Sequence, residues 1–214
     1  MTSIIKVNNI QSSAGNAAAT IASNGAVTFP QAVTFSGAVT GASPAVVVSS
    51  GNAGSAVADL EIDLPTDASY HKFELSIHDI YFSGDTDLAV TFRTQSGSYA
   101  TNYTYSTMER TYGASPSGAS ANAGASNAQL SYYNVGNALI EANSYNIIIT
   151  NNKTASYHTK YFYTAYGLSA SANATVRAGG GSVKGAEIND RLKLEPLTGT
   201  MSHGEWVLYG WKKS

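Results

Sequence analysis

Cysteine is absent from this chain of 214 residues, and charged residues are scarce. The absence of cysteine excludes disulfide bonds, a thiolate nucleophile and any zinc or iron–sulfur site with cysteine ligands. Charged residues make up 12% of the chain, whereas an average soluble domain has about 25%. The formal net charge is −2 and the pI is about 6.0. The chain therefore lacks the basic surface that a nucleic-acid partner requires.

Long apolar runs are also missing. The longest wholly apolar stretch, Pro44 to Val48, is far shorter than the roughly 20 residues that cross a bilayer as a helix. Lys6 interrupts the N-terminal segment where a signal peptide needs its apolar core. We therefore expect no membrane span and no secretion signal.

Short segments with alternating apolar and polar residues fill the chain from Leu60 onward. Apolar residues occupy every second position in Phe73–Ile77, Leu88–Phe92 and Leu192–Leu194. The alternation slips at His78-Asp79, which indicates a β-bulge. Strands are expected over residues 60–64, 72–82, 88–94, 102–109, 129–134, 145–150, 156–168, 174–178, 191–197 and 205–211. Because no amphipathic helix separates them, the pattern predicts an all-β fold, a β-sandwich that is jelly-roll-like.

Residues 1–43 differ in composition from the rest, and they precede a strand and Gly/Ser linker over 44–58 and a C-terminal domain over 59–214. The first segment repeats a six-residue pattern that begins Ala-Val-Thr. Its apolar residues share one face of an extended ribbon, which predicts self-association. These residues are Val27, Phe29, Val33, Phe35 and Val39. Since there are fewer than three full repeats, two short strands joined by Pro and Gly turns are the alternative.

Catalytic and metal-binding motifs are not found. The four histidines lack metal-binding spacing, and the glycine-rich segment 179–185 matches neither common phosphate-binding pattern. Asp85 and Asp87 could offer carboxylates to Ca²⁺, but a hairpin turn between two strands explains them better. We expect no cofactor, no metal ion and no enzymatic activity. A glycoside hydrolase is a lesser alternative, because its two carboxylates can come from any strands.

Tyrosines cluster in the middle of the C-terminal domain, around segments rich in small residues. Two such segments, 112–128 and 178–185, are expected to be loops, where binding function is often found. A tyrosine ring offers apolar area together with a hydroxyl, which suits a glycan or a protein, although tyrosine is also a common strand residue. The candidate binding residues are Tyr112, Asn122, Asn127, Tyr132 and Tyr133.

Several motifs resemble those of structural proteins of tailed bacteriophages, especially phages of marine bacteria. In the N-terminal segment they are Lys6-Val7-Asn8-Asn9-Ile10 and Ser23 to Phe29. In the C-terminal domain they are Phe73 to Ile80, Asp87 to Phe92 and Ile188 to Gly210. The resemblance implies a virion appendage, most often a tail-fibre-like trimer with an N-terminal attachment segment and a distal β-sandwich.

Three hypotheses follow from these observations. The first is a tail-fibre-like virion protein, a homotrimer that binds a host surface glycan or protein through loops of its C-terminal domain. The second is a capsid decoration protein or head fibre with a purely structural role, and the third is a polysaccharide depolymerase. We expect synthesis in the cytoplasm of the bacterial host and the virion as final location. The expected partners are other virion proteins, bound through the apolar N-terminal strand. The residues of that strand are Ile4, Ile5, Val7 and Ile10.

Overall fold

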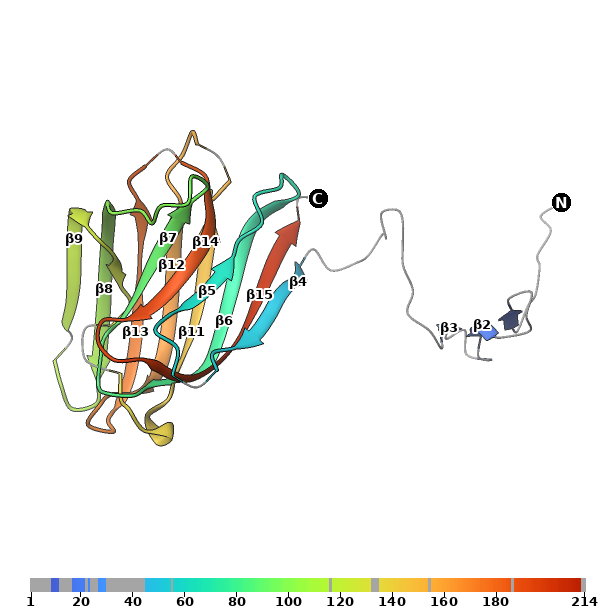
Figure 1. Ribbon diagram of the computed structural model, residues 1–214. Coiled ribbons are helices and arrows are strands. Elements are labelled where there is room, and N and C mark those ends of the chain that lie inside the picture. Colours follow the sequence, from blue (N-terminus) through green and yellow to red (C-terminus); the bar gives the residue numbers. More distant parts are fainter. Residues whose placement is uncertain are drawn as a thin grey trace. The chain divides into compact units, whose positions relative to one another are not determined.

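A computed structural model shows that the chain forms two compact units, residues 1–42 and residues 43–214 (Figure 1). The described residues are 9–11, 17–21, 23, 27–29, 45–54, 56–115, 117–131, 135–153, 155–185 and 187–212. Among them, the single helical element is the 3-10 helix η1 (Leu139–Glu141). No helix in this part of the chain is long and apolar enough to cross a membrane.

The first unit contains three short antiparallel strands in the order β1-β2-β3. They are β1 (Asn9–Gln11), β2 (Ala17–Ile21) and β3 (Val27–Thr28). Phe29 follows β3 and is 48% exposed. Of the residues predicted for self-association or attachment, Val27 lies in β3 and Ile10 in β1, whereas Ile4, Ile5, Val7, Val33, Phe35 and Val39 lie outside the described residues. Both roles stay predictions.

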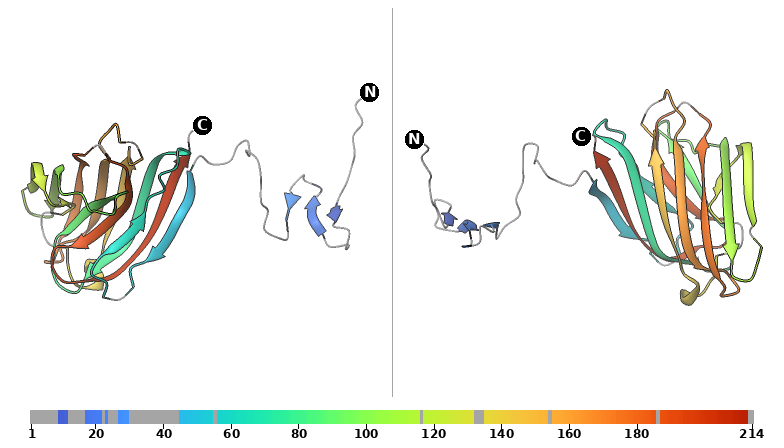
Figure 2. Two further views of the ribbon diagram at one scale, coloured as in Figure 1. Left: turned by 45° about the horizontal axis from the view of Figure 1, so that its top comes forward. Right: turned by 180° about the vertical axis from the view of Figure 1, so that it is seen from behind.

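The second unit is a sandwich of two antiparallel sheets. The larger sheet has eight strands in the order β4-β15-β6-β11-β12-β13-β8-β9, and the smaller has four in the order β10-β7-β14-β5. Figures 1 and 2 show the smaller sheet lying over one face of the larger. This architecture confirms the predicted all-β fold with two packed sheets.

The strands of the larger sheet are β4 (Ala45–Asn52), β15 (Met201–Lys212), β6 (Tyr70–Phe82), β11 (Asn143–Thr150), β12 (Lys160–Leu168), β13 (Ala174–Val183), β8 (Tyr103–Thr111) and β9 (Ser117–Ala125). The strands of the smaller sheet are β10 (Ala128–Gln129), β7 (Leu88–Thr94), β14 (Asn189–Pro196) and β5 (Leu60–Asp63).

The core lies between the sheets and is built from the faces that the alternation predicts. Phe73, Leu75 and Ile77 of β6 are at most 1% exposed and belong to the same buried cluster as Leu192 of β14. Tyr103 of β8 joins the sheets, because its hydroxyl accepts a hydrogen bond from the backbone of β7 at 2.7 Å. A shift by one residue would expose each buried face, so burial fixes the register.

A β-bulge interrupts β6 where the alternation slips. Ile77 lies opposite Tyr145 of β11 and Ile80 opposite Asn143, so three steps along β6 match two along β11. Asp79 in the bulge has a φ of 54°. The extra residue returns Ile80 to the core, where it is fully buried. The predicted bulge is confirmed.

A cluster of polar side chains is buried on the inner face of the larger sheet, over the four neighbouring strands β11, β12, β13 and β8. Arg177 and Glu109 are fully buried, and their side chains form an ion pair with Nε 2.9 Å from Oε2. Arg177 also donates a hydrogen bond to Oδ1 of Asn143. Tyr163 donates its hydroxyl to Thr107 at 3.0 Å. These partners offset the cost of removing a charged pair from water.

Three sequence-based predictions are wrong. The segment 112–128 is not a loop, because β9 occupies most of it and pairs with β8. The segment 178–185 is not a loop either, because β13 continues to Val183. The residues 83–87 do not form a hairpin turn, since β6 and β7 belong to different sheets.

The glycines of β13 have a packing role rather than a turn role. A Cβ atom added to Gly179 would lie 2.8 Å from Cε1 of Tyr163, and one added to Gly181 would lie 2.8 Å from the hydroxyl of Tyr161. Aromatic rings of β12 thus take the space beside these two glycines, which are their direct cross-strand neighbours. A glycine-rich segment that is typical of a loop therefore forms part of β13, a strand with neighbours on both sides.

Candidate functional site

A cleft of 360 Å³ opens at one end of the sandwich. Its walls are the segment 94–102 after β7 and the segment 183–189 between β13 and β14. Its volume lies within the usual range of about 300–1,000 Å³ for small-molecule sites. Hydroxyl groups dominate one wall, from Thr94, Ser96, Ser98, Tyr99 and Thr101.

Hydrogen bonds hold the two walls together. The backbone N–H of Gln95 donates to the carbonyl of Ile188 at 2.8 Å, and that of Lys184 donates to the carbonyl of Asn102 at 2.7 Å. Within the first wall, the Thr94 side chain donates to the carbonyl of Ser98 at 3.0 Å. The walls are thus fixed relative to each other, which reduces the ordering cost of binding.

A buried asparagine also lines the cleft. The side-chain amide of Asn189 donates to Thr159 at 2.8 Å, and its backbone carbonyl accepts from Asn152 at 3.2 Å. Its Oδ1 is buried and has no hydrogen-bond partner among the described residues. An unsatisfied buried acceptor is costly, so Oδ1 would gain from a donor that enters beside it.

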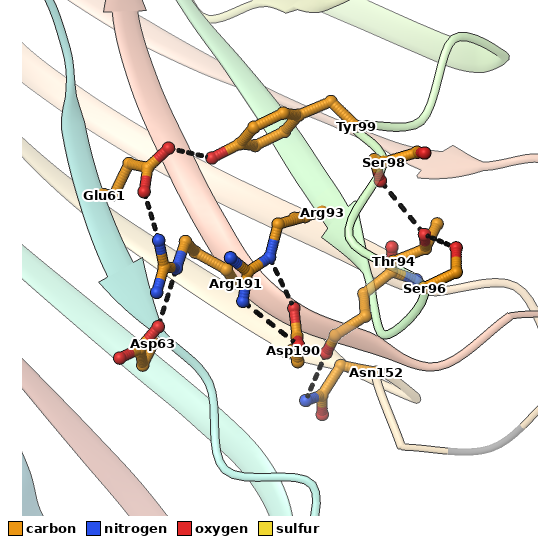
Figure 3. Close-up of polar contacts among 11 residues, drawn as sticks. Glu61, Asp63, Arg93, Thr94, Ser96, Ser98, Tyr99, Asn152, Asp190 and Arg191 are labelled. Carbon is orange, nitrogen blue, oxygen red and sulfur yellow. Dashed lines mark hydrogen bonds and ion pairs between the residues drawn. The ribbon is translucent and has the colours of Figure 1, made fainter.

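The outer face of the smaller sheet, next to the cleft, carries paired charges (Figure 3). Arg191 of β14 lies between Glu61 and Asp63 of β5 and contacts both carboxylates. Arg93 of β7 donates two hydrogen bonds to Asp190, at 3.0 and 3.2 Å. Because each of these two arginines faces an acidic partner, the field outside this face is weak.

Tyr99 connects this charged face to the cleft. Its hydroxyl donates to Glu61, and the Lys193 ammonium lies 4.6 Å from the ring centroid. Burial raises the pKa of Tyr99 far above its ordinary value, and the hydrogen bond to Glu61 raises it further. The hydrogen bond from Tyr99 lowers the pKa of Glu61, with a further contribution from Arg191, although desolvation opposes the shift. The contact therefore joins a neutral phenol to an ionised carboxylate, and it fixes the ring at the cleft edge.

The structure does not bring the predicted binding residues together. Tyr112 is 80% exposed just after β8, whereas Asn127 is half-buried just after β9. These positions lie at opposite ends of β9, a nine-residue strand that spans about 30 Å. The side chains of Asn122, Tyr132 and Tyr133 lie outside the described part. Tyr112 and Asn127 are therefore too far apart to share one binding surface, contrary to the prediction.

Sequence reasoning missed the cleft, although part of its signal was present. Residues 94–102 read Thr-Gln-Ser-Gly-Ser-Tyr-Ala-Thr-Asn, a run of hydroxyl and amide side chains around a glycine with a φ of 94°. That run predicts a turn, but only the sheet order places it against residues 183–189. Within the described residues, no group of three or more histidines and acidic residues could hold a metal ion.

Comparison of the chain with protein-family models, with curated proteins and with solved structures found no match.

Proposed function

We propose that this chain is a tail-fibre-like appendage protein of a tailed-phage virion, and that its cleft binds a neutral glycan of the host surface. The observation that carries the binding site is the hydroxyl-rich cleft with Tyr99 fixed at its edge. The motif resemblance and the charge-poor, cysteine-free composition support the virion assignment. Binding is the activity, and no catalytic step is part of the proposal.

A neutral carbohydrate fits the chemistry of the cleft best. Sugar hydroxyls both donate and accept hydrogen bonds, and the side chains of Thr94, Ser96 and Ser98 can do the same. An aromatic ring stacks on the apolar face of a sugar. The arginines next to the cleft are already paired with carboxylates. The two charged residues that line the cleft itself, Lys184 and Glu187, have opposite signs, so the cleft has no net charge that would favour an ionic ligand. A second cleft of 290 Å³ shares Ser96 and Glu187 with the first, which gives room for more than one sugar unit.

The wider assembly is part of the same proposal. A homotrimer would form through the apolar N-terminal strip, and the first strand would attach it to other virion proteins. The jelly-roll-like description is supported by the strand path, because β5 and β7 lie in the smaller sheet while β6 and β8 lie in the larger. A decoration protein or head fibre is the alternative if the chain binds no host surface.

Binding to bacterial cells tests the proposal. The labelled full chain would be added to a panel of marine bacteria, before and after periodate oxidation of their glycans and, separately, after protease treatment. We expect periodate to abolish binding and protease to leave it intact. Loss of binding after protease treatment alone would indicate a protein receptor. Absence of binding to every strain would favour the structural alternative. Release of reducing sugar ends would instead indicate a depolymerase.

A further inference from the structure

The outer face of the larger sheet carries an exposed apolar patch over β8, β12 and β13. Its large side chains are Met108, Phe162, Tyr166 and Val176, each between 51% and 64% exposed. They are neighbours, because Val176 lies opposite Tyr166, and Ala178 lies opposite Met108. Their exposed surface is on the order of 450 Å², which is as large as patches that mark interaction sites. Seen from behind in Figure 2, no other described element of this unit covers the patch.

The patch contains both projecting side chains and a shallow centre. Gly180 lies between Phe162 of β12 and Ser106 of β8 in the sheet, and Ala178 lies between Thr164 and Met108. Phe162 therefore stands beside a surface of small residues. A face on which a projecting ring stands beside small residues can pack against a copy of itself.

Two opposite charges lie on the two sides of strand β12. Arg110 lies on β8 and Glu74 on β6, each two strands away from β12. Thr164 of β12 is in register with Met108 and Ser76 through the intervening strands. Arg110 is two residues beyond Met108, and Glu74 is two residues before Ser76. Because β6 and β8 run in the same direction, Thr164 lies midway between the two charges.

Arg110 also differs from the other arginines. Arg93, Arg177 and Arg191 each form an ion pair, whereas no ion pair of Arg110 is found in the described part of the chain. Glu74 contacts Lys72 at 3.9 Å and accepts a hydrogen bond from Asn146 at 2.9 Å. A carboxylate has about four acceptor positions, so Glu74 can accept a further cation.

We propose that the outer face around this patch binds the same face on a second copy of the chain, with Arg110 of each copy against Glu74 of the other. A two-fold axis that lies in the plane of the contact, passes over Thr164 and is perpendicular to the line between the two charges exchanges their positions. In this arrangement Phe162 of each copy lies over the small residues of β13 in the other copy, and the three remaining large side chains lie over β6 and β11. The apolar patch with its polar rim approaches the roughly 800 Å² per partner of a standard interface. The contact lies in the second unit and is separate from the predicted self-association of the N-terminal strip.

Disulfide trapping tests the contact, because the chain has no cysteine of its own. The variant is full-length Arg110→Cys with Glu74→Cys. Within one copy the two positions are about 20 Å apart across the sheet, too far for a bond. We expect mild oxidation to produce covalently linked copies in high yield. The matched control replaces Ser171, which is exposed in a turn outside the patch, together with Glu74. A yield no higher than that of the control would overturn the proposal.

Charge reversal gives a second measurement that does not depend on oxidation. Arg110→Glu and Glu74→Arg should each weaken the association of the full chain about tenfold or more in sedimentation equilibrium, because they place like charges together. The double reversal should restore it. Single variants that associate like the wild type would overturn the proposal, as would a double variant no better than the singles.

Discussion

Arg177 and Glu109 are buried as an ion pair in the interior of a protein that has few charges. Alternation places apolar residues inside but gives no reason to place these two there, because charged residues are rarely buried unless they are paired. The pair becomes evident only when β8 and β13 are known to be neighbours. Its stability depends on both members being present.

Glu109→Gln would leave the Arg177 guanidinium buried without its counter-charge. We expect the free energy of unfolding to fall by about 3–5 kcal/mol, as measured by urea denaturation. The matched control is Glu195→Gln, whose partner Lys193 lies on the outer face of the smaller sheet, and it should cost less than about 1 kcal/mol. Equal effects in the two variants would contradict the buried-pair account.

Asp87 makes stability depend on pH. Burial raises the pKa of Asp87, against a hydrogen bond from Ser131 and with a further upward effect of Glu109. The folded state therefore binds the proton more tightly than the unfolded state, so stability falls as pH rises from the ordinary aspartate pKa through the raised one. Asp87→Asn should remove this loss of stability. Its melting temperature should therefore rise relative to that of the wild type as the pH increases from 4 to 7. A variant whose melting temperature differs from that of the wild type equally at both pH values would refute the effect.

Among the strands, alternation predicts β6 and β14 well, because one face of each is apolar and buried and the other is polar. It also predicts β7 from the apolar residues at every second position, although Ala89 and Thr91 on the other face of β7 are buried as well. It fails for β9 and for the second half of β13, where small residues replace the alternating pattern. Beside the glycines of β13, the side chains of Tyr161 and Tyr163 from β12 occupy the space that larger residues would need. The cleft was equally beyond prediction, since its walls come from connections about 80 positions apart in the sequence.

Gly181→Ala tests the packing role of the β13 glycines. The added Cβ would lie 2.3 Å from the carbonyl oxygen of Thr104, a backbone atom that cannot easily move. We expect a loss of about 1–3 kcal/mol in the free energy of unfolding. Gly185→Ala is the control, because its added Cβ would meet nothing within 4 Å. If both variants were as stable as the wild type, the strand would tolerate side chains there and glycine would have another role.

The two units of the whole chain have different roles in the proposals: the first forms the trimer and attaches it to the virion, and the second binds the glycan and makes the two-fold contact. Phe29→Ser combined with Phe35→Ser should disrupt the N-terminal strip and lower the mass found by light scattering. The melting temperature of the sandwich should stay unchanged, since these residues precede it in the chain. A wild-type chain that is monomeric at micromolar concentration would contradict self-association altogether.

Removal of residues 1–22 tests whether the N-terminal strand attaches the chain to the virion. The truncated chain should keep a folded sandwich, because its core belongs to residues 43–214, but it should no longer be incorporated into particles. Particle content measured by mass spectrometry would decide the matter. Normal incorporation of the truncated chain would place the attachment point elsewhere.

A pair of tyrosine variants tests whether the cleft at Tyr99 binds a host glycan. Polysaccharide purified from a strain that binds the wild type would be titrated with Tyr99→Ala and with Tyr112→Ala. We predict that Tyr99→Ala weakens binding about tenfold, or about 1.4 kcal/mol, with a melting temperature within a few degrees of the wild type. Tyr112→Ala should bind like the wild type. Unchanged binding by Tyr99→Ala together with loss in Tyr112→Ala would contradict the account and place recognition at the opposite end of the sandwich.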